Sequence, residues 1–242
     1  MTTPVPATRG YRRLSVEERR GQLLSASLRL FAHRAPDEVS LDDVAAAAGV
    51  SRPLVYRYFP GGKPQLYETA LRSAAEVLQR CFTEPQSGPP TERLARVLDS
   101  YLVFVDQNDA GFSALLRGGS VVETSRTDTI VDGVRRAAAE QILSHLGADR
   151  PGPRLRMLVR TWIAVVEASS LIWLDEGKQP PAHELRAWLV DHLIALLAVS
   201  AATDEDVAGA IGGLMVLERP HSPVGRLARG MLPVVSGASR LL

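Results

Sequence analysis

The sequence predicts an all-α protein in which a small N-terminal bundle of three helices precedes a larger helical domain. Apolar residues recur three and four positions apart along most of the 242 residues, as they do on one face of a helix. Few stretches alternate apolar and polar residues with the period of a strand, and none is bounded by turn residues as a strand would be. Helices of this length do not keep an apolar face in water on their own, so we expect them to pack against one another.

The composition is that of a globular protein whose charge is unevenly distributed. Hydrophobic residues make up 45% of the chain and charged residues 23%, with a net charge of +1. Residues 1–80 contain 12 Lys and Arg against 8 Asp and Glu, whereas residues 81–242 contain 16 against 19. This basic excess at the front is expected of a nucleic-acid-binding module joined to a module that does not contact phosphates.

We expect a cytoplasmic protein that does not enter a membrane. Cys81 is the single cysteine, which excludes an intramolecular disulfide. The N-terminus lacks the apolar segment of a secretory signal, and the apolar stretches over residues 161–174 and 193–202 are interrupted by Glu167 or too short for a membrane span.

The pattern divides the chain into four segments. They are a flexible basic arm over residues 1–13, the three-helix bundle over 14–63, the larger helical domain over 64–202 and a C-terminal extension over 203–242. The arm contains arginines and no apolar period, which is typical of a disordered segment. The extension is read either as a loosely ordered tail with one short helix or as a tail that docks on a partner subunit.

The helices of the bundle are predicted from apolar spacing and from residues that end helices. Leu24, Leu28 and Phe31 lie on one face of a first helix that begins near Ser15, and Pro36 marks its end. Two short helices follow, over Ser40–Ala48 and Ser51–Tyr58.

The larger domain begins after a break at Pro60, Gly61 and Gly62. Pro64 is expected as the first residue of the next helix, where its missing N–H costs nothing, and this helix should run to about Phe82. Residues 84–90 contain three prolines and a glycine and predict a loop. Further helices are expected over about 91–107, 109–117, 124–147, 153–176 and 181–202.

The most informative stretch is residues 40–63, SLDDVAAAAGVSRPLVYRYFPGGK. Ser40 and Asp43 have the spacing of a capping box, which starts a helix. Gly49 is placed where the chain must turn sharply, and Ser51 is a good N-cap for the helix after the turn.

The apolar residues around this turn have the spacing of a helix-turn-helix. A small residue at Ala45 lets two helices approach, and Val50 and Val55 fill the wedge between them. This geometry leaves the N-terminal face of the second helix in solvent, which is the face that a helix-turn-helix presents to the major groove.

The segment VSLDDVAAAAGVSRPLVYRYFPGGK resembles the DNA-binding signature of the TetR family of bacterial regulators, and the similarity extends from Gln22 to Leu66. The rest of the chain matches that family only in its length and helical layout. The resemblance implies that Ser51, Arg52, Pro53 and Leu54 meet base edges in the major groove of double-stranded operator DNA.

The resemblance also implies contacts to the DNA backbone. Tyr56 and Tyr58 would bond phosphates through their hydroxyls, and Arg57 would reach a base or the backbone. Ser40 and Lys63 correspond to positions that contact phosphate from the flanking helices. The family usually has one residue fewer between the Phe-Pro pair and this lysine, so the contact of Lys63 is left open.

By the same resemblance, the helices from about 91 to 175 enclose a pocket for a small-molecule effector. Glu167 interrupts an apolar run, so it either faces the pocket or pairs with an arginine such as Arg160 or Arg117. The candidate pocket residues are Phe104, Gln107, Phe112, Arg117, Trp162 and Glu167.

The last two long helices carry apolar stripes that would form a four-helix interface in a homodimer, as in the TetR family. The alternative is that one or both stripes belong to the core of the monomer. The stripes consist of Leu155, Leu158, Val159, Trp162, Val166 and Ser169, and of Leu185, Leu189, His192, Leu196 and Ser200.

We find no pattern for catalysis, a metal or a cofactor. The five histidines never pair three or four positions apart, and no glycine-rich phosphate loop follows a strand. The expected function is therefore that of a sequence-specific DNA-binding transcriptional regulator, a repressor released from its operator by a small-molecule effector. A transcriptional activator would contain all of the residues discussed, so the sequence does not distinguish it from a repressor. The alternative from another class is a helical ligand-binding or enzymatic protein whose helix-turn-helix no longer reads DNA.

Overall fold

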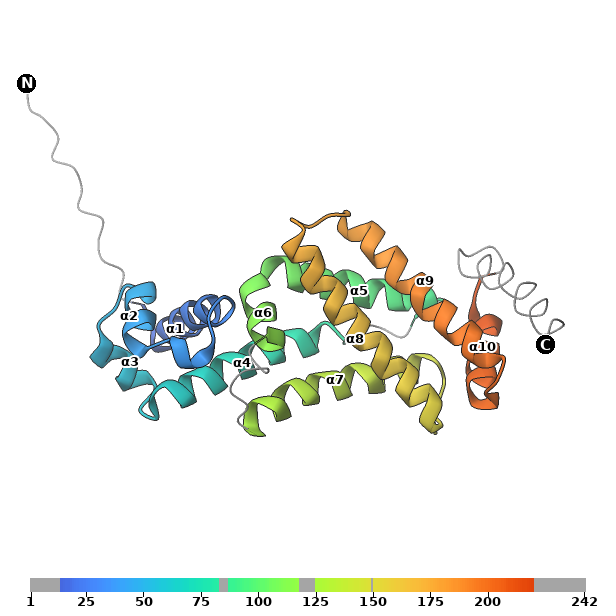
Figure 1. The fold of residues 1–242 in the computed structure, drawn as a ribbon, viewed down its shortest axis with the longest axis horizontal. Coiled ribbons are helices and arrows are strands. Elements are labelled where there is room, and N and C mark those ends of the chain that lie inside the picture. The colour runs from blue at the N-terminus through green and yellow to red at the C-terminus, as the bar shows by residue number, and fades with distance from the viewer. Residues whose placement is uncertain (1–13, 83–86, 118–124, 149, 220–242) are drawn as a thin grey trace, which may run out of the picture.

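The computed structural model describes residues 14–82, 87–117, 125–148 and 150–219 (Figure 1). All regular structure in these residues is helical, which confirms the predicted all-α class. The basic arm and the part of the extension after residue 219 lie outside the described residues. The elements in chain order are α1 (Val16–Phe31), the 3-10 turn η1 (Pro36–Glu38), α2 (Leu41–Ala48), α3 (Arg52–Tyr58), α4 (Gly62–Arg80), α5 (Pro90–Gln107), α6 (Asp109–Arg117), α7 (Ser125–His145), α8 (Pro153–Asp175), α9 (Ala182–Ala201) and α10 (Glu205–Leu217).

The start of α4 differs from the sequence-based prediction. The helix begins at Gly62, two residues before Pro64, because the amide of Gly62 donates to the carbonyl of Phe59 and the turn runs directly into the helix. Pro64 still lies in the first turn, where helix amides have no intrahelical acceptor, so its missing N–H remains harmless.

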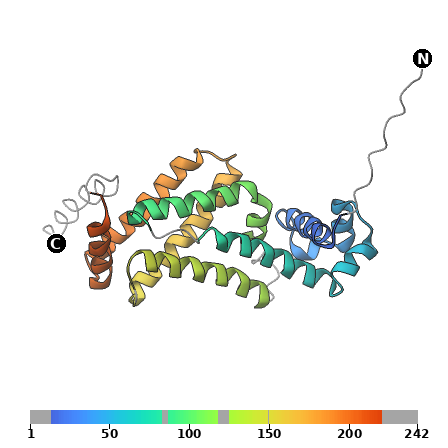
Figure 2. The same ribbon diagram turned by 180° about the vertical axis from the view of Figure 1, so that it is seen from behind.

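The molecule is elongated, with α1, α2 and α3 at one end and α10 at the other (Figures 1 and 2). Helix α4 runs from the small bundle into the larger one and packs on α1 as well as on α7. A second connection is made by α6, which packs on both α1 and α4. The small bundle is therefore attached to the larger domain through two helices.

The turn between α2 and α3 has the predicted helix-turn-helix geometry. Gly49 adopts a left-handed conformation with φ of 64°, and the amide of Val50 donates to the carbonyl of Ala45 at 2.9 Å. Ala45 is buried at the helix crossing, and Val55 is fully buried beneath α3. The wedge of small and branched residues expected from the sequence is confirmed.

Helices α8 and α9 place most of their predicted interface stripes in the core of the monomer. Leu155, Val159 and Trp162 are buried, and the indole N–H of Trp162 donates to the carbonyl of Leu189 on α9 at 3.0 Å. Apolar spacing shows that a helix has a buried face, but it does not show whether the same chain or a partner covers it.

A different face of α8 is apolar and open to solvent. Met157 and Ile172 are 68% and 61% exposed, with small residues between them on the same face. Helix α8 is also long and apolar enough to cross a membrane, a property that it shares with core helices of soluble proteins. The exposed stripe consists of Met157, Thr161, Ala164, Ala168 and Ile172.

The first part of the C-terminal extension is a helix docked on its own chain. Asp204 caps α10 by accepting a hydrogen bond from the amide of Val207 at 3.0 Å. After α10 the buried carboxylate of Glu218 accepts a hydrogen bond from the amide of Thr91 at 2.7 Å, in the first turn of α5. This contact satisfies one of the amides that the start of a helix leaves without an intrahelical partner.

We predict that Gly49→Ala lowers the free energy of unfolding by about 1 kcal/mol, because a Cβ is strained at a φ of 64°. Gly21→Ala is the matched control. Gly21 lies inside α1 with no atom within 4 Å of an added Cβ, so this change should stabilise the protein by about 0.5–1 kcal/mol. Thermal unfolding of the two variants measures the opposite shifts, and equal shifts would contradict the role of Gly49.

Candidate functional site

Helix α3 is held by two buried residues and presents its outer face to solvent. Val55 and Phe59 are fully buried, and the guanidinium of Arg20 on α1 lies 5.0 Å from the centre of the Phe59 ring. The predicted contact residues Arg52, Pro53, Tyr56 and Arg57 are exposed, while Leu54 and Tyr58 are half-buried. Ser51 is the N-cap residue as predicted, but its side chain makes no capping hydrogen bond.

Arg52 at the start of α3 is held by neighbours on two helices. Its Nη1 lies 2.9 Å from Oδ2 of Asp42 on α2, and its guanidinium is 5.6 Å from the centre of the Tyr56 ring. The hydrogen bond with Tyr56 and the charge of Asp42 raise the pKa of Arg52 above its ordinary value. Arg52 is therefore a permanent cation whose orientation is set from α2 and from the next turn of α3.

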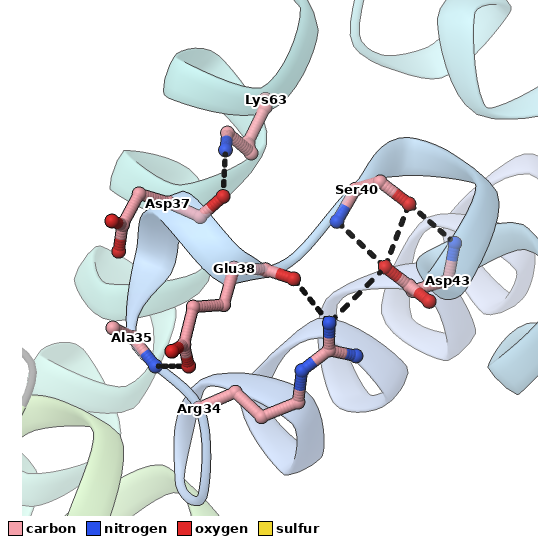
Figure 3. A network of polar contacts seen from close by, with 7 residues as sticks. All are labelled: Arg34, Ala35, Asp37, Glu38, Ser40, Asp43 and Lys63. Atoms are coloured by element: carbon pink, nitrogen blue, oxygen red, sulfur yellow. Dashed lines mark hydrogen bonds and ion pairs between the residues drawn. The ribbon is translucent and has the colours of Figure 1, made fainter.

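Ser40 ends the short segment that precedes α2, and Lys63 lies beside Asp37 near the start of that segment (Figure 3). Ser40 and Asp43 form the predicted capping box, with the Asp43 amide donating to Ser40 Oγ at 3.1 Å and the Ser40 amide donating to Asp43 Oδ2 at 2.8 Å. The Ser40 hydroxyl donates to the same carboxylate oxygen at 2.6 Å, and this bond, together with the one from the Ser40 amide, holds the pKa of Asp43 below its ordinary value. Lys63 Nζ donates to the carbonyl of Asp37 at 3.3 Å. The ammonium of Lys63 therefore lies next to the segment before α2, even with the extra glycine in the PGGK stretch.

The larger domain contains an internal cavity of about 70 Å³ between α4, α5, α6, α7 and α8. Three of the predicted pocket residues, Phe112, Trp162 and Glu167, line it. Leu78 and Phe82, on α4 and just after its end, also line it, so the helix that starts at the small bundle reaches the cavity wall.

Two predicted pocket residues lie elsewhere. Phe104 and Gln107 border a surface groove between α1, α4 and the junction of α5 with α6. The cavity meets α5 only between Leu94 and Tyr101, and the last turn of α5 turns toward the small bundle. The side chain of Arg117 lies outside the described residues.

Glu167 both faces the cavity and forms an ion pair, but its partner differs from the arginines expected. Arg135 on α7 donates from Nε and Nη2 to the Glu167 carboxylate, with the shortest distance 2.9 Å. The hydrogen bonds with Glu167 raise the pKa of Arg135. Arg135 lines the cavity while its side chain is 41% exposed, so this ion pair lies where the cavity meets solvent.

The other polar residues of the cavity were not predicted from the sequence. Tyr101 is buried, and its hydroxyl lies 3.1 Å from that of Ser170, which in turn donates to the carbonyl of Val166. Burial raises the pKa of Tyr101, so the phenol stays neutral. Gln141 and His145 lie on the inward face of α7, and the spacing of four between them is a signal that they share one face.

Comparison with known proteins places both halves of the chain in one family. Residues 23–70 match the family model for bacterial regulatory proteins of the tetR family, and residues 90–196 match the tetracyclin repressor-like C-terminal domain. A tetR-family transcriptional regulator from Streptomyces coelicolor, known from its crystal structure, is 48% identical, with 92% of this chain and 100% of that chain covered and a TM-score of 0.78.

Two further relatives are regulators of transcription. The HTH-type transcriptional activator FasR of Mycolicibacterium smegmatis is 25% identical over 182 residues, which cover 72% of this chain and 81% of FasR. The HTH-type transcriptional regulator HbdR of Aromatoleum sp. is 32% identical over 124 residues, which cover 50% of this chain and 53% of HbdR. With its helix-turn-helix exposed and both domain models matched, the chain belongs to the TetR family of bacterial DNA-binding transcriptional regulators.

Proposed function

We propose that the chain acts as a homodimeric repressor that leaves its operator when a small molecule binds in the internal cavity. The observation that carries this proposal is the exposure of α3, whose outer face offers Arg52, Tyr56 and Arg57 to a groove of DNA. In this proposal residues 14–63 bind DNA and residues 64–202 bind the effector and the partner subunit. The similar protein FasR is named an activator. Whether a regulator of this kind represses or activates depends on where its operator lies.

In this proposal the DNA-contacting residues of α3 and of its neighbouring helices have two roles: some read bases, and others bind the phosphate backbone of DNA. Ser51, Arg52, Pro53 and Leu54 form the first turn, which enters the groove first. Arginine suits guanine because its planar fork matches two acceptors on that base. The backbone contacts are assigned to Tyr56, Arg57, Tyr58, Ser40 and Lys63.

A dimer would supply the second reading head that a useful operator requires. One helix-turn-helix reads too few base pairs, and a two-fold dimer places two heads about 34 Å or a multiple of it apart. The exposed stripe on α8 supports the dimer because its two ends are large and apolar and its middle residues, Ala164 and Ala168, are small enough for a close helix approach. A stripe of this kind is typical of an interface between copies.

Release from DNA would follow from a ligand that prefers one arrangement of the two heads. A ligand shifts this equilibrium only by the difference in its affinity for the two arrangements. The cavity is walled by Leu78 on α4 and by Phe112 on α6, and both helices also pack on α1. A change in cavity shape therefore has two routes to the DNA-binding bundle.

We expect Arg52→Ala to relax base preference and to weaken operator binding by about 1–3 kcal/mol, because the fork that reads a base pair is lost. Binding of the variant to operator and to random duplex DNA, compared by fluorescence anisotropy, measures this change. A variant that keeps its selectivity would remove Arg52 from the base-reading residues.

Lys63→Ala should act differently, because a phosphate contact carries no sequence information. Affinity for all duplexes should fall alike, and the slope of log affinity against log salt should decrease by about 1 for each head. Titrations at several salt concentrations provide the slope, and an unchanged slope would mean that Lys63 serves only its bond to the carbonyl of Asp37.

The interface proposal predicts that Ile172→Glu yields a monomer and weakens operator binding at least about tenfold, because a charge would be buried against apolar surface. Val103→Glu on α5 is the matched control, since Val103 is a similarly exposed aliphatic residue at 53%. Sedimentation velocity distinguishes the two variants. A dimeric Ile172→Glu variant would exclude this face of α8 as the interface.

A further inference from the structure

The internal cavity is small in volume, yet it is lined by residues along a long stretch of α7. Its lining residues on α7 extend from Val131 to His145, which corresponds to about 20 Å of helix. The cavity volume is only about 70 Å³, and a single water requires roughly 10–15 Å³ on that scale. A slender unbranched chain fits such a slot, whereas a fused ring system would require the helices to separate.

Most polar groups of the cavity are already satisfied within the protein. Arg135 and Glu167 bind each other, and the Tyr101 hydroxyl is bonded to Ser170. The other lining residues apart from Gln141 and His145 are aliphatic or aromatic. A ligand that fills the slot is therefore apolar along most of its length.

His145 is the exception. Its ring is buried, and Nε2 of the Gln141 amide lies 3.2 Å from Nε2 of the imidazole. With the Gln141 amide in this orientation its N–H donates to the imidazole Nε2, and a neutral ring then carries its proton on Nδ1. Among the described residues this buried Nδ1 has no hydrogen-bond partner. A buried donor without an acceptor is costly, so this end of the slot favours a ligand that brings one.

The charges around His145 favour an anionic acceptor. Burial lowers the pKa of His145, and the positive charges of Arg93 and Arg96 on α5 lower it further. Burial disfavours charge of either sign, but the positive charges of Arg93 and Arg96 that oppose protonation of the ring also attract a negative charge beside it. Arg93 also donates to the carbonyl of His145 at 3.4 Å, so its guanidinium is close to this end of α7.

We propose that the effector is a slender, unbranched aliphatic carboxylic acid, with its chain along α7 and its carboxylate accepting a hydrogen bond from Nδ1 of His145. This inference rests on the proposed function in taking the cavity as the effector site. It adds the chemical class of the ligand and the direction in which the ligand lies.

Octanoate, methyl octanoate and octylamine are suitable probes, because they share one chain and differ in the head group. With the full-length protein in calorimetric titrations, octanoate should bind at least about tenfold more tightly than the ester, as expected for a charge-assisted hydrogen bond, and the amine should bind least. His145→Leu should bring acid and ester to within about threefold. His183→Leu, which makes the same change at an exposed position of α9 outside the cavity lining, should leave the preference in place.

Three results would overturn the inference. They are equal binding of acid and ester by the wild-type protein, an acid preference that survives in His145→Leu, and an acid preference that disappears in His183→Leu. A measurement on the wild-type protein covers the case in which His145→Leu does not fold. Carboxyl-labelled octanoate, observed by carbon NMR, should remain ionised when bound at a pH where half of the free acid is protonated, and protonation of the bound acid at a higher pH than the free acid would contradict the proposal.

Operator binding in the same samples separates this inference from the proposed function. If octanoate binds with a preference that depends on His145 but operator affinity does not change, the ligand class stands and release by the cavity ligand fails. If an apolar compound without an acid group releases the operator while octanoate does not bind, the proposed function stands and the ligand class fails.

Discussion

The arrangement of the whole molecule depends on how a seven-residue helix is kept folded in water. A helix as short as α3 is not stable alone, because the first turn costs more conformational entropy than its hydrogen bonds return. Val55 and Phe59 supply what is missing by lying fully buried at the base of α3. Because only this base is fully buried, the outer face of α3 is left in solvent with the side chains of Arg52, Tyr56 and Arg57.

The burial of Val55 and Phe59 also connects α3 to the rest of the molecule. The base of α3 packs inside the small bundle. This bundle is connected to the larger domain by α4 and by the packing of α6 on α1. Since both helices also wall the cavity, the position of α3 and the shape of the cavity are properties of one connected structure. A gene regulator that responds to a small molecule needs such a connection, because coupling between two sites requires elements that both sites bias.

Much of the DNA-binding half could be predicted because its signals are local. The capping box of Ser40, the left-handed turn at Gly49 and the buried Val55 each depend on neighbours a few residues away. The cavity could not be predicted in the same way. Glu167 was expected to pair with Arg160 or Arg117, whereas its partner is Arg135, 32 residues earlier, and this pairing depends on how α7 and α8 are rotated about their axes. The same uncertainty explains why Phe104 and Gln107 were placed on the pocket, since spacing along α5 does not show at which end a cavity lies.

The contact between Glu218 and the start of α5 gives the end of the chain a role in the domain that it follows. Glu218 comes after α10, yet its carboxylate replaces the missing hydrogen-bond partner of an amide 127 residues earlier. A chain truncated after α9 would lose this cap and would also uncover the apolar side of α9 on which α10 packs. Shortening the protein at its C-terminus would thus loosen the first turn of α5, the helix whose residues Leu94 to Tyr101 form one wall of the cavity.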